Sequence, residues 1–175
     1  MCFNILLLSE CFLPGKTSCE DEGVSVSLKP ENGETVLFFS IDNSSCQLRN
    51  ILGLNQPNMA ICDSLVFYAK NQERIICFVE LKRSGDLSRA TEQVINTYNH
   101  FNTFLQKTGE NFNFTFTPKA FLKLEGSVPQ EYQRYKDRLR KTFGEDNYDH
   151  NGKSTDFGNF LRGIPRKSKG KRKKS

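Results

Sequence analysis

The 175-residue sequence has no tryptophan, only two histidines and no long apolar run. No stretch approaches the roughly 18 consecutive apolar residues of a membrane span, so we expect no membrane partner. Residues 5–8 are apolar, but they are too few for a secretory signal and no basic residue precedes them. Fifteen phenylalanines take the place of tryptophan and are expected to carry much of the packing. At this length we expect one principal domain, in a protein that stays inside the cell.

The cysteines lack the spacing of a metal site. No two of the six form a CxxC pair, and two histidines add few further ligands, so we expect no structural zinc site. Reduced cysteines within strands behave as small apolar residues. We expect all six to be free thiols, consistent with a cytoplasmic location. They are Cys2, Cys11, Cys19, Cys46, Cys62 and Cys77.

Charge is concentrated at the C-terminal end. The chain has a net charge of +5, but residues 162–175 contain eight Lys and Arg and no acid. The rest of the chain therefore holds 17 basic and 20 acidic residues, a net charge of −3. Beyond residue 145 the composition is polar and rich in glycine, so we expect a folded domain over residues 1–145 and a disordered tail over residues 146–175. Within that tail, Phe157, Phe160 and Leu161 are candidates for a short docking segment.

The basic tail has two interpretations. Clustered cations bind the phosphate backbone of nucleic acids, and we expect the tail to contribute affinity in this way. Residues 169–174, KGKRKK, also resemble a nuclear-localisation run, which would place the protein in the nucleus of a eukaryotic cell. The expected nucleic-acid-binding residues of the tail are Arg166, Lys167, Lys169, Lys171, Arg172, Lys173 and Lys174.

Residues 62–82 carry the clearest pattern in the chain. Two segments rich in β-branched and aromatic residues, 62–69 and 75–82, flank a polar turn. With Asn71 and Gln72 as the loop, an antiparallel hairpin places Asp63 opposite Glu80, with their Cβ atoms about 5 Å apart. Lys82 lies two residues after Glu80, so its side chain leaves from the same face.

Two opposed carboxylates repel each other unless a cation lies between them. Mg²⁺ and Mn²⁺ prefer oxygen ligands, and Mg²⁺ often binds one or two carboxylates together with a substrate phosphate. A lysine beside such an ion can orient the attacking water or stabilise negative charge on the phosphate. The simpler alternative is a surface strand that ends in alternating charges. The apolar run 75–79 favours the former, because Glu80 and Lys82 would then end a buried core strand.

Asp63 followed by Glu80-Leu81-Lys82 resembles the motif of the PD-(D/E)XK nuclease superfamily, which has the restriction-endonuclease-like fold. The segment after it, with Ala90, Gln93 and Tyr98, is similar to the glutamine-containing helix of RecB-like and Holliday-junction-resolvase-like members. The resemblance covers about residues 34–125. Two departures are that Cys62 stands at the motif's proline position and that Gln93 and Tyr98 are five residues apart instead of four.

The resemblance implies an α/β fold with a central mixed β-sheet flanked by helices. It implies that Asp63, Glu80 and the Leu81 carbonyl bind Mg²⁺ or Mn²⁺ and that Lys82 serves the water. The activity implied is that of a nuclease, with DNA the favoured substrate, and many members act as homodimers. Members often carry a further acidic residue near the metal, on an N-terminal helix. Here Glu10, Glu20 and Glu22 are candidates, with a solvated acidic loop as the alternative.

Other elements follow from periodicity. We expect strands at 24–28, 34–42 and 112–124, and helices at 86–107 and 129–143. The alternating Phe112, Phe114 and Phe116 fit core packing better than base stacking.

Four polar residues have open roles. Asp42 either approaches the site or caps a turn. Gln93 either reaches toward Lys82 or a phosphate, or is simply solvated. Arg83 and Arg89 either contact phosphate or are exposed charges.

Three functions remain open on the sequence alone. The first is a metal-dependent nuclease. The second is a binding or adaptor module of the same fold with weak or no chemistry, and the third is a structural protein with a targeting tail. The intact set of Asp63, Glu80 and Lys82 favours the nuclease.

Overall fold

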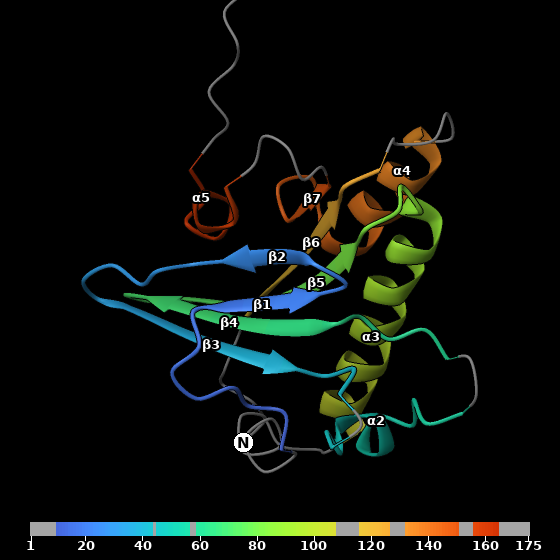
Figure 1. Cartoon of the computed structure of the whole chain (residues 1–175), viewed down its shortest axis with the longest axis horizontal. Helices are drawn as coiled ribbons and strands as arrows, with labels where there is room; N and C mark the ends of the chain where they lie inside the picture. Colours follow the sequence, from blue (N-terminus) through green and yellow to red (C-terminus); the bar gives the residue numbers. More distant parts are fainter. Residues whose placement is uncertain are drawn as a thin grey trace, which may run out of the picture.

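The computed structural model describes residues 10–43, 45–56, 59–107, 116–126, 132–150 and 156–164. A five-stranded mixed sheet forms the centre, in the order β3-β4-β5-β6-β7 (Figure 1). Strands β3, β4 and β5 are antiparallel neighbours, whereas β6 and β7 run parallel to β5. The expected α/β fold with a mixed sheet is confirmed. The strands are β3 (Glu34–Ser40), β4 (Ser64–Lys70), β5 (Glu73–Lys82), β6 (Thr117–Leu124) and β7 (Tyr148–His150).

Helices cover one face of this sheet. Helix α3 (Leu87–Lys107) packs on β5 and β6, and α4 (Tyr132–Phe143) packs on α3 and β6. Asp86 begins α3 as expected, because its carboxylate accepts the Arg89 N–H at 2.9 Å. Phenylalanines dominate the packing here. Phe78 on β5 meets the rings of Tyr98, Phe101 and Phe143 at centroid distances of 5.6, 6.0 and 6.1 Å.

A second, two-stranded sheet lies across the opposite face (Figure 1). Strands β1 (Ser18–Asp21) and β2 (Val24–Ser27) form this hairpin, and its apolar residues are buried against β4, β5 and β6. The short helix α5 (Phe157–Leu161) packs beside β2. The short helix α2 (Leu48–Ile51) follows β3. None of the described helices is long and apolar enough to cross a membrane.

The expected domain boundary at residue 145 is wrong. Strand β7 pairs with β6 and so extends the sheet, and Phe157 and Leu161 of α5 are buried. The ring of Phe157 lies 4.9 Å from that of Phe121 on β6, which confirms a docking segment. Composition alone does not predict β7 and α5, because each is short and is stabilised by packing on β6 and β2. The basic residues 166–174 lie outside the described residues.

The expectation that all cysteines are free is also wrong. Cys11 and Cys46 form a disulfide, whereas Cys19, Cys62 and Cys77 are free and buried. The pair meets because the N-terminal segment runs along β3, where the Ser40 N–H donates to the Cys11 carbonyl at 2.9 Å. Spacing of 35 residues in the sequence gives no sign of this contact. Cys2 lies outside the described residues.

The C-terminal segment is anchored by an ion pair that supplies a stability prediction. Arg162 donates from Nε and Nη2 to the two oxygens of Glu34, both at 2.9 Å, and the pKa of Glu34 lies well below its usual range chiefly for this reason. Replacing Arg162 with methionine removes the bidentate partner and leaves the shielded carboxylate with the Glu31 N–H, the Tyr68 hydroxyl and the Lys70 ammonium, so we expect a loss of about 2 kcal/mol in unfolding free energy by urea denaturation.

Arg140→Met is the matched control. Arg140 pairs with Asp137 at 3.0 Å on an exposed helix surface, so its loss should cost less than about 1 kcal/mol. Equal effects for the two variants would contradict the role assigned to Arg162.

Candidate functional site

The β4–β5 hairpin has the register that the sequence predicts. Its pairs run from Lys70 opposite Glu73 to Ser64 opposite Val79, and one further step places Asp63 opposite Glu80. The backbone at Asp63 is fixed from β3, because the Ile41 N–H donates to the Asp63 carbonyl at 3.0 Å. The predicted register is therefore confirmed, and Asp63 directly precedes its first pair.

Both acids lie below the surface. Glu80 is fully buried and Asp63 is 8% exposed. Lys82 Nζ lies 2.5 Å from Glu80 Oε1, as the shared face of β5 predicts. Beyond this ion pair, neither carboxylate oxygen of Glu80 accepts a hydrogen bond of ordinary geometry. A buried carboxylate so poorly supplied with donors is costly in free energy and has capacity for a further ligand.

The surroundings shift the acidity of all three groups. Burial raises the pKa of Glu80 to about 8, and the nearby charge of Asp63 adds to this while Lys82 opposes it. Burial also raises the pKa of Asp63 to about 6, against the hydrogen bond from the Leu81 N–H and the charge of Lys82. Burial alone would lower the pKa of Lys82, but the bond and charge of Glu80 raise it overall. Near neutral pH the pair thus holds a proton that a divalent cation would displace.

The backbone at Leu81 supplies a further oxygen. The Leu81 N–H donates to Asp63 Oδ2 at 2.7 Å, so this residue's main-chain groups point toward the Asp63 side. The next carbonyl, that of Lys82, accepts from the Glu125 N–H at 3.0 Å and so points the other way, toward β6. Alternation along a strand therefore directs the Leu81 carbonyl to the same side as Asp63.

These donors fit a hard divalent cation, because carboxylate and carbonyl oxygens suit Mg²⁺ and Mn²⁺. Among the described residues, no group of three or more Asp, Glu, His or Cys side chains is placed to hold a metal ion. The donor set is thus two carboxylates and a carbonyl, and water and substrate oxygens would have to complete it. A small set of this kind is typical of Mg²⁺ sites that bind phosphate substrates.

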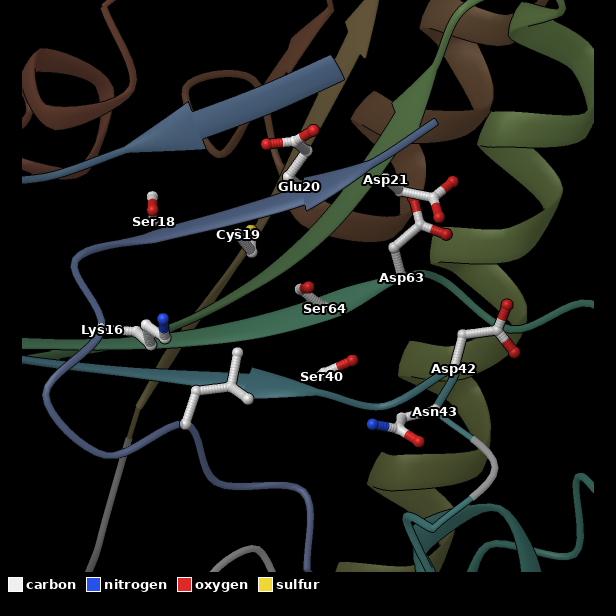
Figure 2. A pocket seen from close by; sticks show the side chains of 11 residues that line it. Lys16, Ser18, Cys19, Glu20, Asp21, Ser40, Asp42, Asn43, Asp63 and Ser64 are labelled. Atoms are coloured by element: carbon white, nitrogen blue, oxygen red, sulfur yellow. The ribbon is translucent and has the colours of Figure 1, made fainter. Parts of the chain in front are cut away.

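The residue that sequence reasoning missed is Asp21. Its carboxylate lies beside that of Asp63 (Figure 2), and its charge contributes to raising the pKa of Asp63 and of Asp42. Asp21 leaves β1 on the same face as Cys19, which is buried against the large sheet. The alternation of Cys19 and Asp21 in the sequence could have predicted that Asp21 faces the large sheet, but only with the knowledge that β1 lies over that sheet.

The three acids expected from the sequence do not take this place. The Glu20 side chain points away from Asp63 (Figure 2). Glu10 and Glu22 are exposed residues with positive φ, 57° and 48°.

Asp42 lies beside the site. It follows β3, pairs with Arg49 at 3.3 Å, and lines the same pocket as Asp63. Burial raises the pKa of Asp42, against the opposing charge of Arg49. In the turn that follows, Asn43 Oδ1 accepts the Ser45 N–H at 3.1 Å.

Gln93 positions the backbone and does not reach Lys82. Its Nε2 donates to the Ile61 carbonyl at 2.8 Å. One turn later, Thr97 Oγ1 accepts the Cys62 N–H at 2.9 Å. Helix α3 thus holds the chain that leads into Asp63. The Tyr98 ring is part of the core, 5.6 Å from Phe78.

The two arginines at the start of α3 differ. Both are exposed, but Arg89 lines a pocket that it shares with Gln93, whereas Arg83 lines neither of the two pockets next to the site.

Comparisons with known protein families, with curated proteins and with solved structures find no significant match to this chain.

Proposed function

We propose that this protein is a metal-dependent nuclease that hydrolyses phosphodiester bonds, with DNA the favoured substrate. The observation that carries the proposal is the buried pair of Asp63 and Glu80 with Lys82 bound to it. The pair consists of two buried acids at the end of a core strand, and the Glu80 oxygens accept no hydrogen bond of ordinary geometry beyond the Lys82 ion pair. Such an arrangement is costly for the fold and is typical of a functional site.

Each residue has a distinct part in this proposal. Asp63, Glu80 and the Leu81 carbonyl would hold Mg²⁺ or Mn²⁺, which would supply Lewis-acid chemistry and lower the pKa of the attacking water. Lys82 is held against Glu80 and places a positive charge where it can orient that water or stabilise the phosphate. Gln93 and Thr97 fix the approach to Asp63, so they are positioning residues.

The fold supports the same proposal. A mixed sheet, with the acids on the central antiparallel pair and a long helix after the Glu-x-Lys strand, is the arrangement that the restriction-endonuclease-like resemblance implies. The further acid comes here from the β1–β2 hairpin instead of a helix. The homodimer that this resemblance suggests remains a prediction.

A binding module without chemistry is the second candidate. It is favoured by the Glu80–Lys82 ion pair, which satisfies part of the charge at the site without any metal. Incubation with linear, single-stranded, branched and circular DNA and RNA separates the two functions. A nuclease cleaves at least one substrate with Mg²⁺ or Mn²⁺ and none with EDTA, whereas a binding module cleaves none under either condition.

We expect the basic tail to contribute affinity but not chemistry. Seven Lys and Arg residues follow Ile164, and each can add up to about 0.9 to the slope of log affinity against log salt concentration for duplex DNA. Because the tail is expected to bind incompletely, about half of that total, roughly 3, is expected. A variant without the tail should end at Ile164, so that it keeps Arg162 and its hydrogen bonds to the Glu34 carboxylate.

Removing the tail should therefore flatten the salt dependence by about 3 while the cleavage rate at saturating substrate persists. The measurement is DNA affinity across a series of salt concentrations for the full and truncated chains. Equal slopes would show instead that the tail serves targeting or solubility.

A further inference from the structure

Two pockets adjoin at Asp42, one on each side of it. The first has a volume of about 490 Å³ and lies between β1 and the start of β4, with Asp63 in its wall (Figure 2). The second has a volume of about 550 Å³ and lies between the first half of α3 and residues 59–61. Asp42 lines both pockets, and the chain from Ile61 to Asp63 passes from one to the other. A ligand lying along both would pass the candidate metal site.

The pockets are small in relation to a double helix. Each volume is in the range of pockets that hold one drug-sized ligand, roughly 300–1,000 Å³. The β1–β2 hairpin forms one wall of the first pocket, and the carboxylates are recessed, with Glu80 fully buried. The phosphates of a duplex lie on the outside of a rigid helix, whereas a flexible single strand can bend to bring one phosphate toward a recessed carboxylate.

Cations lie toward both ends of this path. Lys16 is in the wall of the first pocket, at the end away from Asp63 and Asp42 (Figure 2). Arg49 and Arg89 line the second pocket. Between Lys16 and Asp63 the wall carries hydroxyl groups, including those of Ser40 and Ser64, which can donate hydrogen bonds to phosphate and sugar oxygens.

We propose that the two pockets bind one unpaired strand of nucleic acid, so that the substrate is a single strand or the unpaired end of a longer one. This inference rests on the proposed function, because four carboxylates against one lysine leave the first pocket negatively charged. A polyanion binds there only once a divalent cation is present. Lys16 and Arg89 then contact phosphates on either side of the reacting one.

The test measures binding by the full chain in Ca²⁺, which takes oxygen ligands as Mg²⁺ does, and in EDTA. The probes are labelled 12-nucleotide DNA and RNA single strands and their blunt duplexes, at one fixed salt concentration. In Ca²⁺ we expect at least one single strand to bind about tenfold or more tighter than its duplex. The tail contacts the backbones of both forms and so contributes affinity to both.

The charge reversal Lys16→Glu tests whether the nucleic-acid strand binds in the first pocket. It is expected to weaken single-strand binding in Ca²⁺ by about threefold or more and to have little effect in EDTA. Lys29→Glu is the matched control, since Lys29 is also exposed in the N-terminal part but lines neither pocket. Duplexes that bind as tightly as single strands, or equal effects of Lys16→Glu and Lys29→Glu, would overturn the inference.

Cleavage of the same probes in Mg²⁺ and Mn²⁺ separates this inference from the proposed function. A preference for single strands without any cleavage overturns the nuclease and supports strand binding in the pockets. Cleavage of duplexes and single strands at equal rates and affinities supports the nuclease and overturns the single-strand inference.

Discussion

Glu80→Gln is expected to abolish metal-dependent cleavage and to leave the protein folded and more stable. Glutamine keeps the size of the side chain but removes the charge that binds the cation. It also removes the repulsion between Glu80 and Asp63 and the cost of a buried carboxylate. Loss of activity here therefore cannot be attributed to a loss of folding.

The gain in stability should depend on pH. The pKa of Glu80 is about 8 in the folded protein, against an ordinary value of 4.5. When folding raises the pKa of a group, the stability that the group contributes is fully present at pH values below its pKa in the unfolded chain. That contribution is lost as the pH rises through its pKa in the folded protein. The wild type should thus lose stability between about pH 4.5 and pH 8, by a few kcal/mol at roughly 1.4 kcal/mol per unit. The glutamine variant lacks this loss.

Melting temperatures of wild type and Glu80→Gln at pH 5 and pH 8.5, without divalent cations, measure this difference. The advantage of the variant should be small at pH 5 and several degrees at pH 8.5. Glu73→Gln is the matched control, because Glu73 is exposed at the start of the same strand. Full cleavage activity in folded Glu80→Gln would contradict the assignment of this site.

Lys82→Ala is expected to reduce the maximal cleavage rate by about 10²-fold or more, the usual scale of electrostatic or acid–base assistance. Its ammonium lies 2.5 Å from Glu80 Oε1 and its side chain is 17% exposed, so a positive charge lies directly beside the candidate metal ligand. Substrate affinity should change far less, because the tail and both pockets remain.

The ion pair makes the pH of this measurement important. Lys82 lowers the pKa of Glu80, so its removal makes Glu80 harder to ionise and weakens metal binding at neutral pH. Rates should therefore be compared above pH 8 at saturating Mn²⁺. Lys82→Arg, which keeps the charge, should retain more of the rate than Lys82→Ala. A large rise in KM with an unchanged kcat would make Lys82 a phosphate anchor instead.

Local signals account for what the sequence predicted correctly. The register of Asp63 and Glu80 follows from a short polar turn between two apolar segments, and strand alternation then places Lys82. Helix α3 begins at its expected cap, Asp86. Each of these features depends on residues that are close in the chain, so the sequence alone contains the necessary information.

Contacts between distant segments account for what it missed. Asp21 reaches the site only because the β1–β2 hairpin lies across the sheet, and no local pattern specifies that placement. Cys11 meets Cys46 only because the N-terminal segment runs beside β3. Arg162 looked like the first residue of a basic tail, but it closes an ion pair with Glu34, 128 residues away.

The central claim is that Asp63 and Glu80 together bind a divalent cation, and titration of the melting temperature with Mn²⁺ tests it most directly. At pH 8.5 the wild type should become more stable by about 2.7 kcal/mol when Mn²⁺ reaches 100 times its Kd, and the rise should continue with the logarithm of concentration. Asp146→Asn, an exposed carboxylate elsewhere, should behave as the wild type does. Asp63→Asn should show no rise. A wild type that Mn²⁺ does not stabilise, or an equal rise in Asp63→Asn, would contradict the claim.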